Sequence, residues 1–193
     1  MTNRLDYLIE AYDDGFFPAN YKGGKGRTYL VGVEVEGRVK VRKIAWLTVR
    51  VDFNTTTRSI ISISKILNGR VILLDGLTYA GFDVVDPVEL SSAVGKAVIV
   101  IQTHPLNLAK MRLALEKHFE DWQERYRVIE NVYKKMVYVD TPWRTIRIYN
   151  AGISVNEAIN VVKNTCIYSP VPEPLRIADK VASAISRLTY LYA

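Results

Sequence analysis

Along the stretch Thr28-Tyr-Leu-Val-Gly-Val-Glu-Val-Glu36, polar and apolar side chains alternate and several side chains are β-branched. This pattern is typical of a β-strand. Gly37-Arg38 follows as a short turn, and the alternation resumes, less strictly, over residues 39–52. Upstream, residues 5–12 include too few polar side chains for an exposed helix and lead into the turn signal Asp13-Asp14-Gly15. Three consecutive strands joined in this way predict an antiparallel meander at the start of the fold.

The chain after this meander predicts helices that alternate with buried strands. Asn54-Thr55-Thr56 offers N-cap residues for a helix that extends to Leu67, and Val71-Ile-Leu-Leu-Asp75 is a continuous apolar run, as expected for a strand covered on both faces. The further expected elements are a helix over 85–94, a strand over 97–103, a helix over 108–119, strand segments over 138–140 and 145–150, a helix opened by the capping box Ser154-Val-Asn-Glu157, and a last helix with Pro174 near its first turn. This order predicts an α/β protein with a ribonuclease H-like mixed sheet, in one domain spanning residues 1–193.

Composition limits the classes of protein to which the chain can belong. Its 193 residues are 49% hydrophobic, enough for one sizeable core, and the 24% of charged residues is ordinary for a globular protein. The purest apolar run, Lys96-Ala-Val-Ile-Val-Ile101, has the length of a strand and falls far short of the roughly 20 apolar residues that span a bilayer. Cys166 is the only cysteine, which excludes an internal disulfide and a cysteine-cluster zinc site. The first residues show no apolar signal core, so we expect a cytoplasmic protein without membrane contact.

The formal net charge of +6 favours a polyanionic partner but does not identify one. Lys22, Lys25 and Arg27 lie in a glycine-rich loop that is not a phosphate-binding P-loop, because Lys25 is followed by Gly26 and not by Ser or Thr. This loop is either a basic segment that holds a phosphate backbone or a plain mobile connection. The segment Trp143-Arg144, with Arg147, lies near a predicted strand edge, where it can contact nucleic acid or another subunit.

Two aspartates fall at the predicted ends of strands. Asp13 ends the first strand and Asp75 ends the run Val71 to Leu74. Ligands of open α/β sheets collect at the carboxyl ends of parallel strands, and carboxylate oxygens are the ligands that Mg²⁺ prefers. Two such ions could activate a water molecule and stabilise a leaving oxygen. The alternative is turn chemistry, because Asp-Asp-Gly and Asp-Gly also form tight turns.

Three collinear motifs carry a resemblance to a known family. The segment Val71-Ile-Leu-Leu-Asp-Gly-Leu-Thr-Tyr-Ala-Gly-Phe-Asp-Val-Val-Asp86 resembles the signature of the archaeal endonuclease dU family, which is itself similar to endonuclease V. Asp13-Asp14-Gly15-Phe16-Phe17 and Pro172-Glu-Pro-Leu-Arg-Ile-Ala-Asp179 resemble two further segments of that family. The resemblance spans most of the chain.

This resemblance implies an endonuclease of ribonuclease H-like fold that uses Mg²⁺, or Mn²⁺, to cleave nucleic acid near a deaminated base, with DNA preferred to RNA. By position, Asp13 and Asp75 would be the central metal ligands, and Asp179 stands where relatives carry a His or Asp. Asp52 stands where the family has an acidic catalytic residue. Asp14 and Arg176 lie within the matched motifs and are secondary candidates.

Two departures from the family pattern leave an alternative open. Thr55 stands where the family has a further Asp, and the aromatic-proline wedge with which endonuclease V probes a duplex is not evident before Asp52. The alternative is a catalytically weakened protein that binds nucleic acid or serves as a scaffold. His104, in a loop after a strand, either assists proton transfer or is simply exposed.

The last helix raises a question about Asp179. Its large apolar side chains form a stripe that lies roughly opposite to Asp179 and predicts a solvated position for it; these side chains are Ile177, Val181, Ala184, Ile185 and Leu188. A role in metal binding requires instead that the first turns of this helix lie across the end of the sheet.

Overall fold

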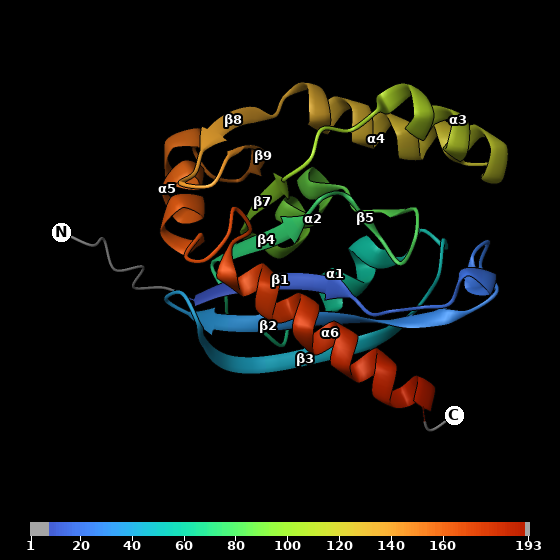
Figure 1. Cartoon of the computed structure of the whole chain (residues 1–193), viewed down its shortest axis with the longest axis horizontal. Helices are drawn as coiled ribbons and strands as arrows, with labels where there is room; N and C mark the ends of the chain where they lie inside the picture. Colours follow the sequence, from blue (N-terminus) through green and yellow to red (C-terminus); the bar gives the residue numbers. More distant parts are fainter. Residues whose placement is uncertain (1–7, 192–193) are drawn as a thin grey trace.

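A seven-stranded mixed sheet in the order β3-β2-β1-β4-β7-β9-β8 forms the centre of the molecule (Figure 1). The computed structural model describes residues 8–191. The strands of the sheet are β1 (Leu8–Asp14), β2 (Arg27–Glu36), β3 (Lys40–Arg50), β4 (Val71–Asp75), β7 (Ala97–Gln102), β8 (Val137–Asp140) and β9 (Thr145–Ala151), and β5 (Thr78–Tyr79) pairs with β6 (Asp83–Val84) in a separate hairpin. The helices are η1 (Ala19–Tyr21), α1 (Thr56–Ser64), α2 (Pro87–Val94), α3 (Leu108–His118), α4 (Trp122–Lys134), α5 (Val155–Thr165) and α6 (Glu173–Leu191).

The predicted meander is present, with β1 antiparallel to β2 and β2 antiparallel to β3. The first strand runs further than predicted, because Asp13 and Asp14 both pair with β2 instead of forming a turn. Residues 5–7 of the predicted strand lie outside the described residues. The third strand ends earlier than predicted, at Arg50, and Asp52 lies beyond it in a turn with a φ of 63°.

The parallel part of the sheet also follows the prediction. β4 runs parallel to β1, and β7 runs parallel to β4. β9 then pairs antiparallel with β7 and β8 antiparallel with β9, which extends the sheet by a hairpin. The carboxyl ends of β1, β4 and β7 therefore lie at one edge of the sheet.

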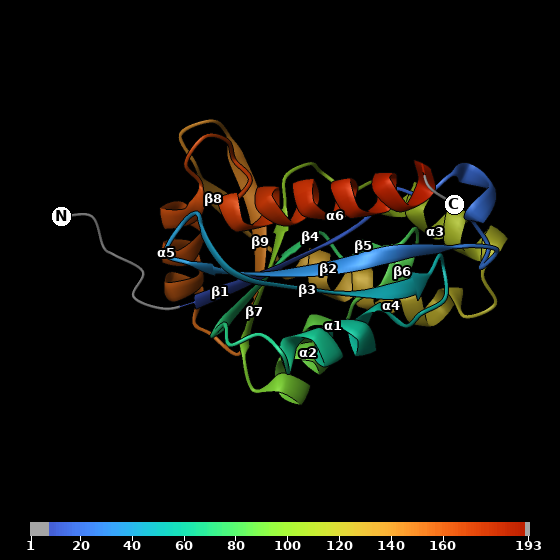
Figure 2. The same ribbon diagram turned by 90° about the horizontal axis from the view of Figure 1, so that it is seen from below.

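Helices cover both faces of the sheet, with α6 and α5 on one face and α1 and α2 on the other (Figure 2). Successive side chains of β1 point to opposite faces of the sheet and so belong to two different cores. Ile9 and Ala11 pack in the core on the α6 face, whereas Tyr12 packs in the core on the α1 face together with buried residues of α2, α3 and α4. Within residues 8–191, the model contains no helix with the length and apolarity needed to cross a membrane.

The region between α1 and β8 differs most from the sequence prediction. The helix α4 and the β5–β6 hairpin were not predicted. The helix α1 ends at Ser64 and not at Leu67, and the side chain at its N-cap, Thr55, makes no capping hydrogen bond. Asp83 takes over that role, because its Oδ2 accepts hydrogen bonds from the backbone N–H groups of Thr55 and Thr56.

A buried ion pair closes the opposite edge of the sheet. Lys96 Nζ lies 2.5 Å from Glu10 Oε1 and also donates to the carbonyl oxygens of Ser64 and Leu67. Glu10 is fully buried, and its second carboxylate oxygen accepts a hydrogen bond from Tyr12 Oη at 2.7 Å. The polar groups of this buried network are therefore paired, as burial of charge requires.

We predict that Lys96→Met lowers the free energy of unfolding by about 3–5 kcal/mol, because the Glu10 carboxylate would be left buried without its cation. Urea denaturation followed by circular dichroism measures this change. The control Lys65→Met alters an exposed lysine next to the same network and should leave the unfolding free energy close to that of the parent. Equal stability of the two variants would contradict the prediction.

Candidate active site

The structure brings Asp13 and Asp75 together at the carboxyl edge of the sheet. The parallel pairing of β1 with β4 runs as far as Tyr12 opposite Leu74, and the next residue on each strand is one of the two aspartates. Residues two apart on a strand lie on the same face, so Asp13 shares a face with Ala11 on β1 and Asp75 shares a face with Leu73 on β4. Ala11 and Leu73 both belong to the core on the α6 side. Both carboxylates therefore lie on the α6 face of neighbouring strands.

A tyrosine hydroxyl lies between the two strands at the point where their pairing stops. Tyr79 Oη accepts a hydrogen bond from the Asp75 N–H at 3.1 Å and donates one to the Tyr12 carbonyl oxygen at 3.4 Å. The side chain is buried, and burial together with the charges of Asp13, Asp75 and Asp14 raises the pKa of its phenol well above the ordinary value. Tyr79 is a site residue that the sequence analysis missed, because nothing in the sequence distinguishes this loop tyrosine from the other tyrosines.

The position of Asp179 corrects the prediction from the apolar stripe. The residues of α6 that are buried against the sheet are Leu175, Ala178, Ala182 and Ser186, whereas Leu188 is 56% exposed. Asp179 lies four residues after Leu175 and three before Ala182, so it borders the sheet-facing side of the helix. Its side chain is 47% exposed, lies 2.9 Å from Lys180 Nζ, and is close enough to affect the pKa of both Asp13 and Asp75.

The predicted stripe is only partly right, because Ile177, Val181 and Ile185 pack against the core but are less buried than Leu175, Ala178 and Ala182. The face of α6 that packs against the sheet carries small residues, which allow the helix to approach closely. A Cβ added at Gly15 would lie 2.6 Å from Ser186 Cβ, and Ser186 Oγ accepts a hydrogen bond from the Phe16 N–H at 2.9 Å.

The electrostatics of this edge disfavour negative charge. Burial raises the pKa of Asp13 to about 8, with further contributions from Asp14, Asp75 and Asp179. Asp75 reaches solvent at the end of β4, but surrounding protein still desolvates its carboxylate, and this burial and the charge of Asp179 raise its pKa, whereas His104 lowers it. Within residues 8–191, neither Asp13 nor Asp75 forms an ion pair with a lysine or arginine.

The donor set fits a hard divalent cation that keeps water in its shell. Within the described part of the chain, no three His, Cys, Asp or Glu side chains form a ready-made metal site. Mg²⁺ is commonly held by one or two carboxylates, with water and substrate phosphate as its other ligands. Asp13 and Asp75 provide this pair, and Asp179 provides a third carboxylate at the rim.

Asp14 and Asp52 serve the other side of the site. The Asp14 side chain lies on the α1 face. Burial, with a smaller effect of the charge of Asp83, raises its pKa to about 6, although hydrogen bonds from backbone groups, chiefly that of Ala80, lower it. Both carboxylate oxygens of Asp52 accept backbone N–H groups, from Phe82 at 2.7 Å and from Gly23 at 2.8 Å. Asp52 therefore joins the glycine-rich loop to the β5–β6 hairpin, and it is not among the groups that raise the pKa of Asp13 or Asp75.

Arg125, a second residue that the sequence analysis missed, supports the same hairpin. It is buried and donates to the carbonyl oxygens of Phe82 and Asp52, and it also pairs with Asp121 at 2.8 Å. Its position on an otherwise polar helical segment gave no signal in the sequence.

Basic residues flank the carboxylates on the β2 side. Lys22, Lys25 and Arg27 are all exposed, on the loop that leads out of the carboxyl end of β1 and on the first residue of β2. The loop backbone is held in place by a hydrogen bond from Arg50 Nη2 to the Gly24 carbonyl oxygen at 2.9 Å. Arg176, in contrast, is engaged within its own motif, because its Nη1 lies 2.7 Å from Glu173 Oε1.

Further cations lie on the β7 side. His104 follows β7 and is close enough to lower the pKa of Asp75. Arg144 Nη2 lies 3.4 Å from His104 Nε2. His104 and Arg144 are therefore the basic side chains that the structure ties to Asp75, whereas Lys22, Lys25 and Arg27 are not among the groups that shift the pKa of Asp13 or Asp75.

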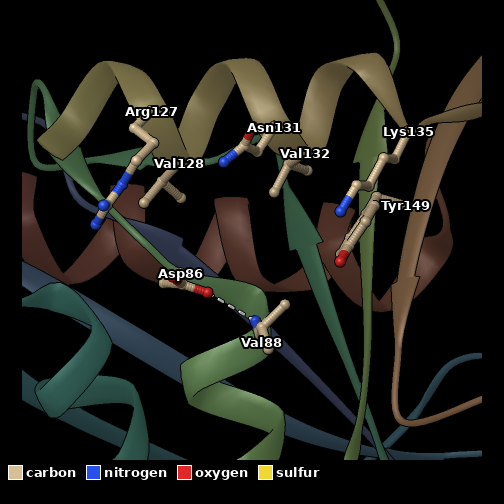
Figure 3. A pocket seen from close by; sticks show the side chains of 8 residues that line it. All are labelled: Asp86, Val88, Arg127, Val128, Asn131, Val132, Lys135 and Tyr149. Carbon is tan, nitrogen blue, oxygen red and sulfur yellow. Dashed lines mark hydrogen bonds between the residues drawn. The ribbon is translucent and has the colours of Figure 1, made fainter. Parts of the chain in front are cut away.

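A separate cleft of about 170 Å³ opens between α2 and α4 on the opposite face of the sheet (Figure 3). Arg127 and Asn131 of α4 line one side of it opposite Asp86, and Lys135, just after α4, points toward Tyr149 (Figure 3). This cleft contains none of the predicted site residues.

Comparison with known proteins shows the family to which the chain belongs. A family model described as endonuclease dU matches residues 8–186. A protein of Thermococcus gammatolerans, named only as a UPF0215 protein, is 34% identical over 180 residues, which cover 92% of this chain and 91% of the relative. A UPF0215 protein of Methanothermobacter thermautotrophicus is 38% identical over 162 residues, which cover 81% of this chain and 78% of the relative.

Solved structures share the fold. A protein of unknown function from Archaeoglobus fulgidus superposes with a TM-score of 0.78 at 23% identity and covers 93% of this chain and 98% of its own. Endonuclease V of Bacillus subtilis superposes with a TM-score of 0.63 at 13% identity, covering 96% and 83%. Endonuclease V of Ciona intestinalis, in complex with a 24mer DNA that contains an inosine followed by a ribo-adenosine, gives a TM-score of 0.60 at 13% identity, covering 96% and 87%.

The raised pKa of Asp13 predicts a pH dependence of stability. In the unfolded chain this carboxyl has its ordinary pKa of 3.8, whereas in the folded protein the pKa is about 8, so the folded state binds the extra proton between these values. The unfolding free energy measured in EDTA should therefore fall as pH rises from 3.8 to about 8. Asp14 and Asp75, whose pKa values are also raised, contribute with the same sign.

The variant Asp13→Asn should have a shallower pH dependence and greater stability than the parent at pH 8. Urea denaturation between pH 5 and pH 9 measures both quantities. Asp140→Asn, which alters an exposed aspartate at the end of β8, is the matched control and should keep the slope of the parent. An unchanged slope in Asp13→Asn would show that this carboxyl does not titrate as described.

Proposed function

Because this chain belongs to the endonuclease dU family, we propose that it is an endonuclease that depends on a divalent metal and hydrolyses phosphodiester bonds in nucleic acid. The observation that carries the proposal is the pair Asp13 and Asp75 on neighbouring parallel strands, without a protein cation between them in the described residues. Desolvated carboxylates that repel each other are strongly stabilised by a divalent ion.

Asp13 and Asp75 would hold Mg²⁺ or Mn²⁺, with Asp179 at the rim of the same site. When bound, such an ion polarises a phosphoryl oxygen and lowers the pKa of a water molecule. The chain itself positions the two carboxylates. Tyr79 fixes the spacing of the strands, and the close approach of α6 places Asp179 beside them.

The exposed cations would position the substrate. Lys22, Lys25 and Arg27 on one side, and His104 with Arg144 on the other, lie where a phosphate backbone can cross the carboxylates. Such contacts fix the register of a nucleic acid strand without reading its sequence. The charge of His104 acts on Asp75, and this makes His104 the candidate for proton transfer at the site.

We infer that the substrate is DNA with a deaminated base, uracil or hypoxanthine, and that the reaction serves DNA repair. The family description and the inosine-containing DNA in the complex of the Ciona endonuclease V support this inference.

A second candidate function rests on Thr55 and Asp52. Thr55 stands where the family has an Asp, and the Asp52 carboxylate is occupied by two backbone N–H groups. Both observations favour a protein with a reduced set of acidic ligands, which binds nucleic acid and cleaves it slowly.

The test is cleavage of uracil- and inosine-containing oligonucleotides in Mn²⁺ or Mg²⁺. Asp13→Asn and Asp75→Asn should each lower kcat/KM by about a hundredfold or more, because each removes a charge that holds the ion. Glu116→Gln, an exposed position on α3, should cleave at the rate of the parent. Binding of Mn²⁺, measured by calorimetry, should weaken in the two aspartate variants alone.

The outcomes separate the two functions. Binding of oligonucleotide without turnover would favour the second candidate. Cleavage that persists undiminished in Asp75→Asn would remove the proposed active site.

A further inference from the structure

The turn between β8 and β9 holds a tryptophan in a fixed, exposed position. Thr141 Oγ1 donates to the Arg144 carbonyl oxygen at 2.6 Å and accepts the N–H groups of Trp143 at 3.3 Å and Arg144 at 3.2 Å. The Thr141 N–H donates to the same carbonyl oxygen at 3.2 Å. Trp143 is 43% exposed at the tip of this turn, so its ring is presented to solvent by a rigid frame.

Positive charge and further aromatic rings accompany this tryptophan. The Arg147 guanidinium lies 4.7 Å from the ring centroid of Tyr133 and 4.7 Å from that of Tyr138, and it donates to Tyr138 Oη at 2.5 Å. Tyr138 is 66% exposed, and Arg144 is exposed at the turn. Tyr138 and Arg147 alternate with Val139 and Ile148 of the α6-side core, so their side chains face α4 and not the carboxylates. Trp143 and Arg144, both at the turn, are named here the hairpin platform.

The hairpin platform adjoins the carboxylates. Arg147 on β9 pairs with Gln102, the last residue of β7, and Ile101 on β7 pairs with Asp75. The turn that carries Trp143 therefore lies beyond the same sheet edge as Asp75. Arg144 also contacts His104, whose charge acts on Asp75.

We propose that the hairpin platform binds an unpaired nucleotide next to the phosphate at the active site, with a base stacked on Trp143 and the backbone held by Arg144. This proposal rests on the proposed function, since it adds a subsite to the same active site. Nucleic acid matches the combination of an exposed ring with an exposed arginine better than an apolar protein partner does. A base inside a continuous duplex is covered on both faces, so an exposed ring gains stacking only from a base that is unpaired or displaced.

The rigid turn strengthens this stacking. A side chain that is already held in place loses little conformational freedom on binding, so more of the stacking energy appears as affinity. The exposed Trp46 on β3 offers a comparison, because it is 53% exposed on the strand at the far edge of the sheet.

The experiment measures binding of fluorescein-labelled oligothymidine, single-stranded or paired with oligoadenosine, by fluorescence anisotropy in EDTA. Trp143→Ala should weaken binding of the single strand by about tenfold or more and binding of the duplex much less. Trp143→Phe should retain most of the affinity, because the aromatic face is kept. Trp46→Ala should bind both probes like the parent. Arg144→Ala should make the slope of log affinity against log salt concentration less steep by about one unit, as expected for the loss of one phosphate contact.

Single-strand affinity that is unchanged in Trp143→Ala, or reduced equally in Trp46→Ala, would overturn the proposal. An equal loss for duplex and single strand would overturn the assignment to an unpaired base. Because binding is measured without metal, these results are independent of catalysis. A protein that binds through Trp143 but cleaves no oligonucleotide would contradict the proposed function alone.

Discussion

The placement of two carboxylates at the end of one parallel strand pair is the constraint on which the rest of the structure depends. Asp13 and Asp75 are adjacent because β1 and β4 run in the same direction and end together. Burial raises the pKa of both groups, with a further contribution from the charge of Asp179, so the fold keeps a pair of acidic side chains where their ionised forms are unfavourable. Such a cost is typical of sites in which a bound ion later compensates the charge.

The surrounding elements maintain this placement by close contact and hydrogen bonding. The small residues of α6 allow the helix to approach β1, where Gly15 meets Ser186. On the other face, Asp52 and Asp83 accept backbone N–H groups and Arg125 donates to backbone carbonyl groups, and these contacts tie together the segments around the β5–β6 hairpin. That hairpin contributes Tyr79, whose hydroxyl ends the pairing of β1 with β4 at the two aspartates. Asp52, for which the family resemblance implies a catalytic role, is therefore bound in this structure to backbone N–H groups of two segments.

Periodicity and apolar runs were enough to predict the meander and the strands that follow it along the chain, apart from β5 and β6. The meander, the buried run Val71 to Leu74 and the position of Asp75 all follow from patterns that local chemistry fixes. The capping box at Ser154 was also predicted correctly, because both of its hydrogen bonds are local. The family resemblance, which the family model bears out, added the roles expected of the aspartates.

Features that depend on contacts between distant segments could not be predicted. The helix α4 was missed although Trp122, Tyr126 and Ile129 recur at helical spacing, because its other residues are mostly polar and it buries an arginine. Capping of α1 by Asp83 joins residues 27 and 28 positions apart in the chain. The orientation of α6 was predicted only in part, because Ile177, Val181 and Ile185 pack against the core beside the helix axis, and only the tertiary packing shows that Leu175, Ala178 and Ala182 lie at its centre.

In the described part of the chain, buried charge is paired at one edge of the sheet and unpaired at the other, and this contrast indicates where the chemistry takes place. At one edge, Glu10 and Lys96 are paired and further hydrogen-bonded to Tyr12 and to backbone carbonyl groups. At the other edge, the fold brings Asp13, Asp75 and Asp179 together, and within residues 8–191 only Asp179 of the three forms an ion pair, with Lys180. The same chain thus neutralises buried charge where stability alone is at stake and leaves it uncompensated at the edge that also carries the hairpin platform. A metal ion held there, as proposed, would suit a substrate that carries its own negative charge, because a phosphate could contact the ion and Arg144 at the same time.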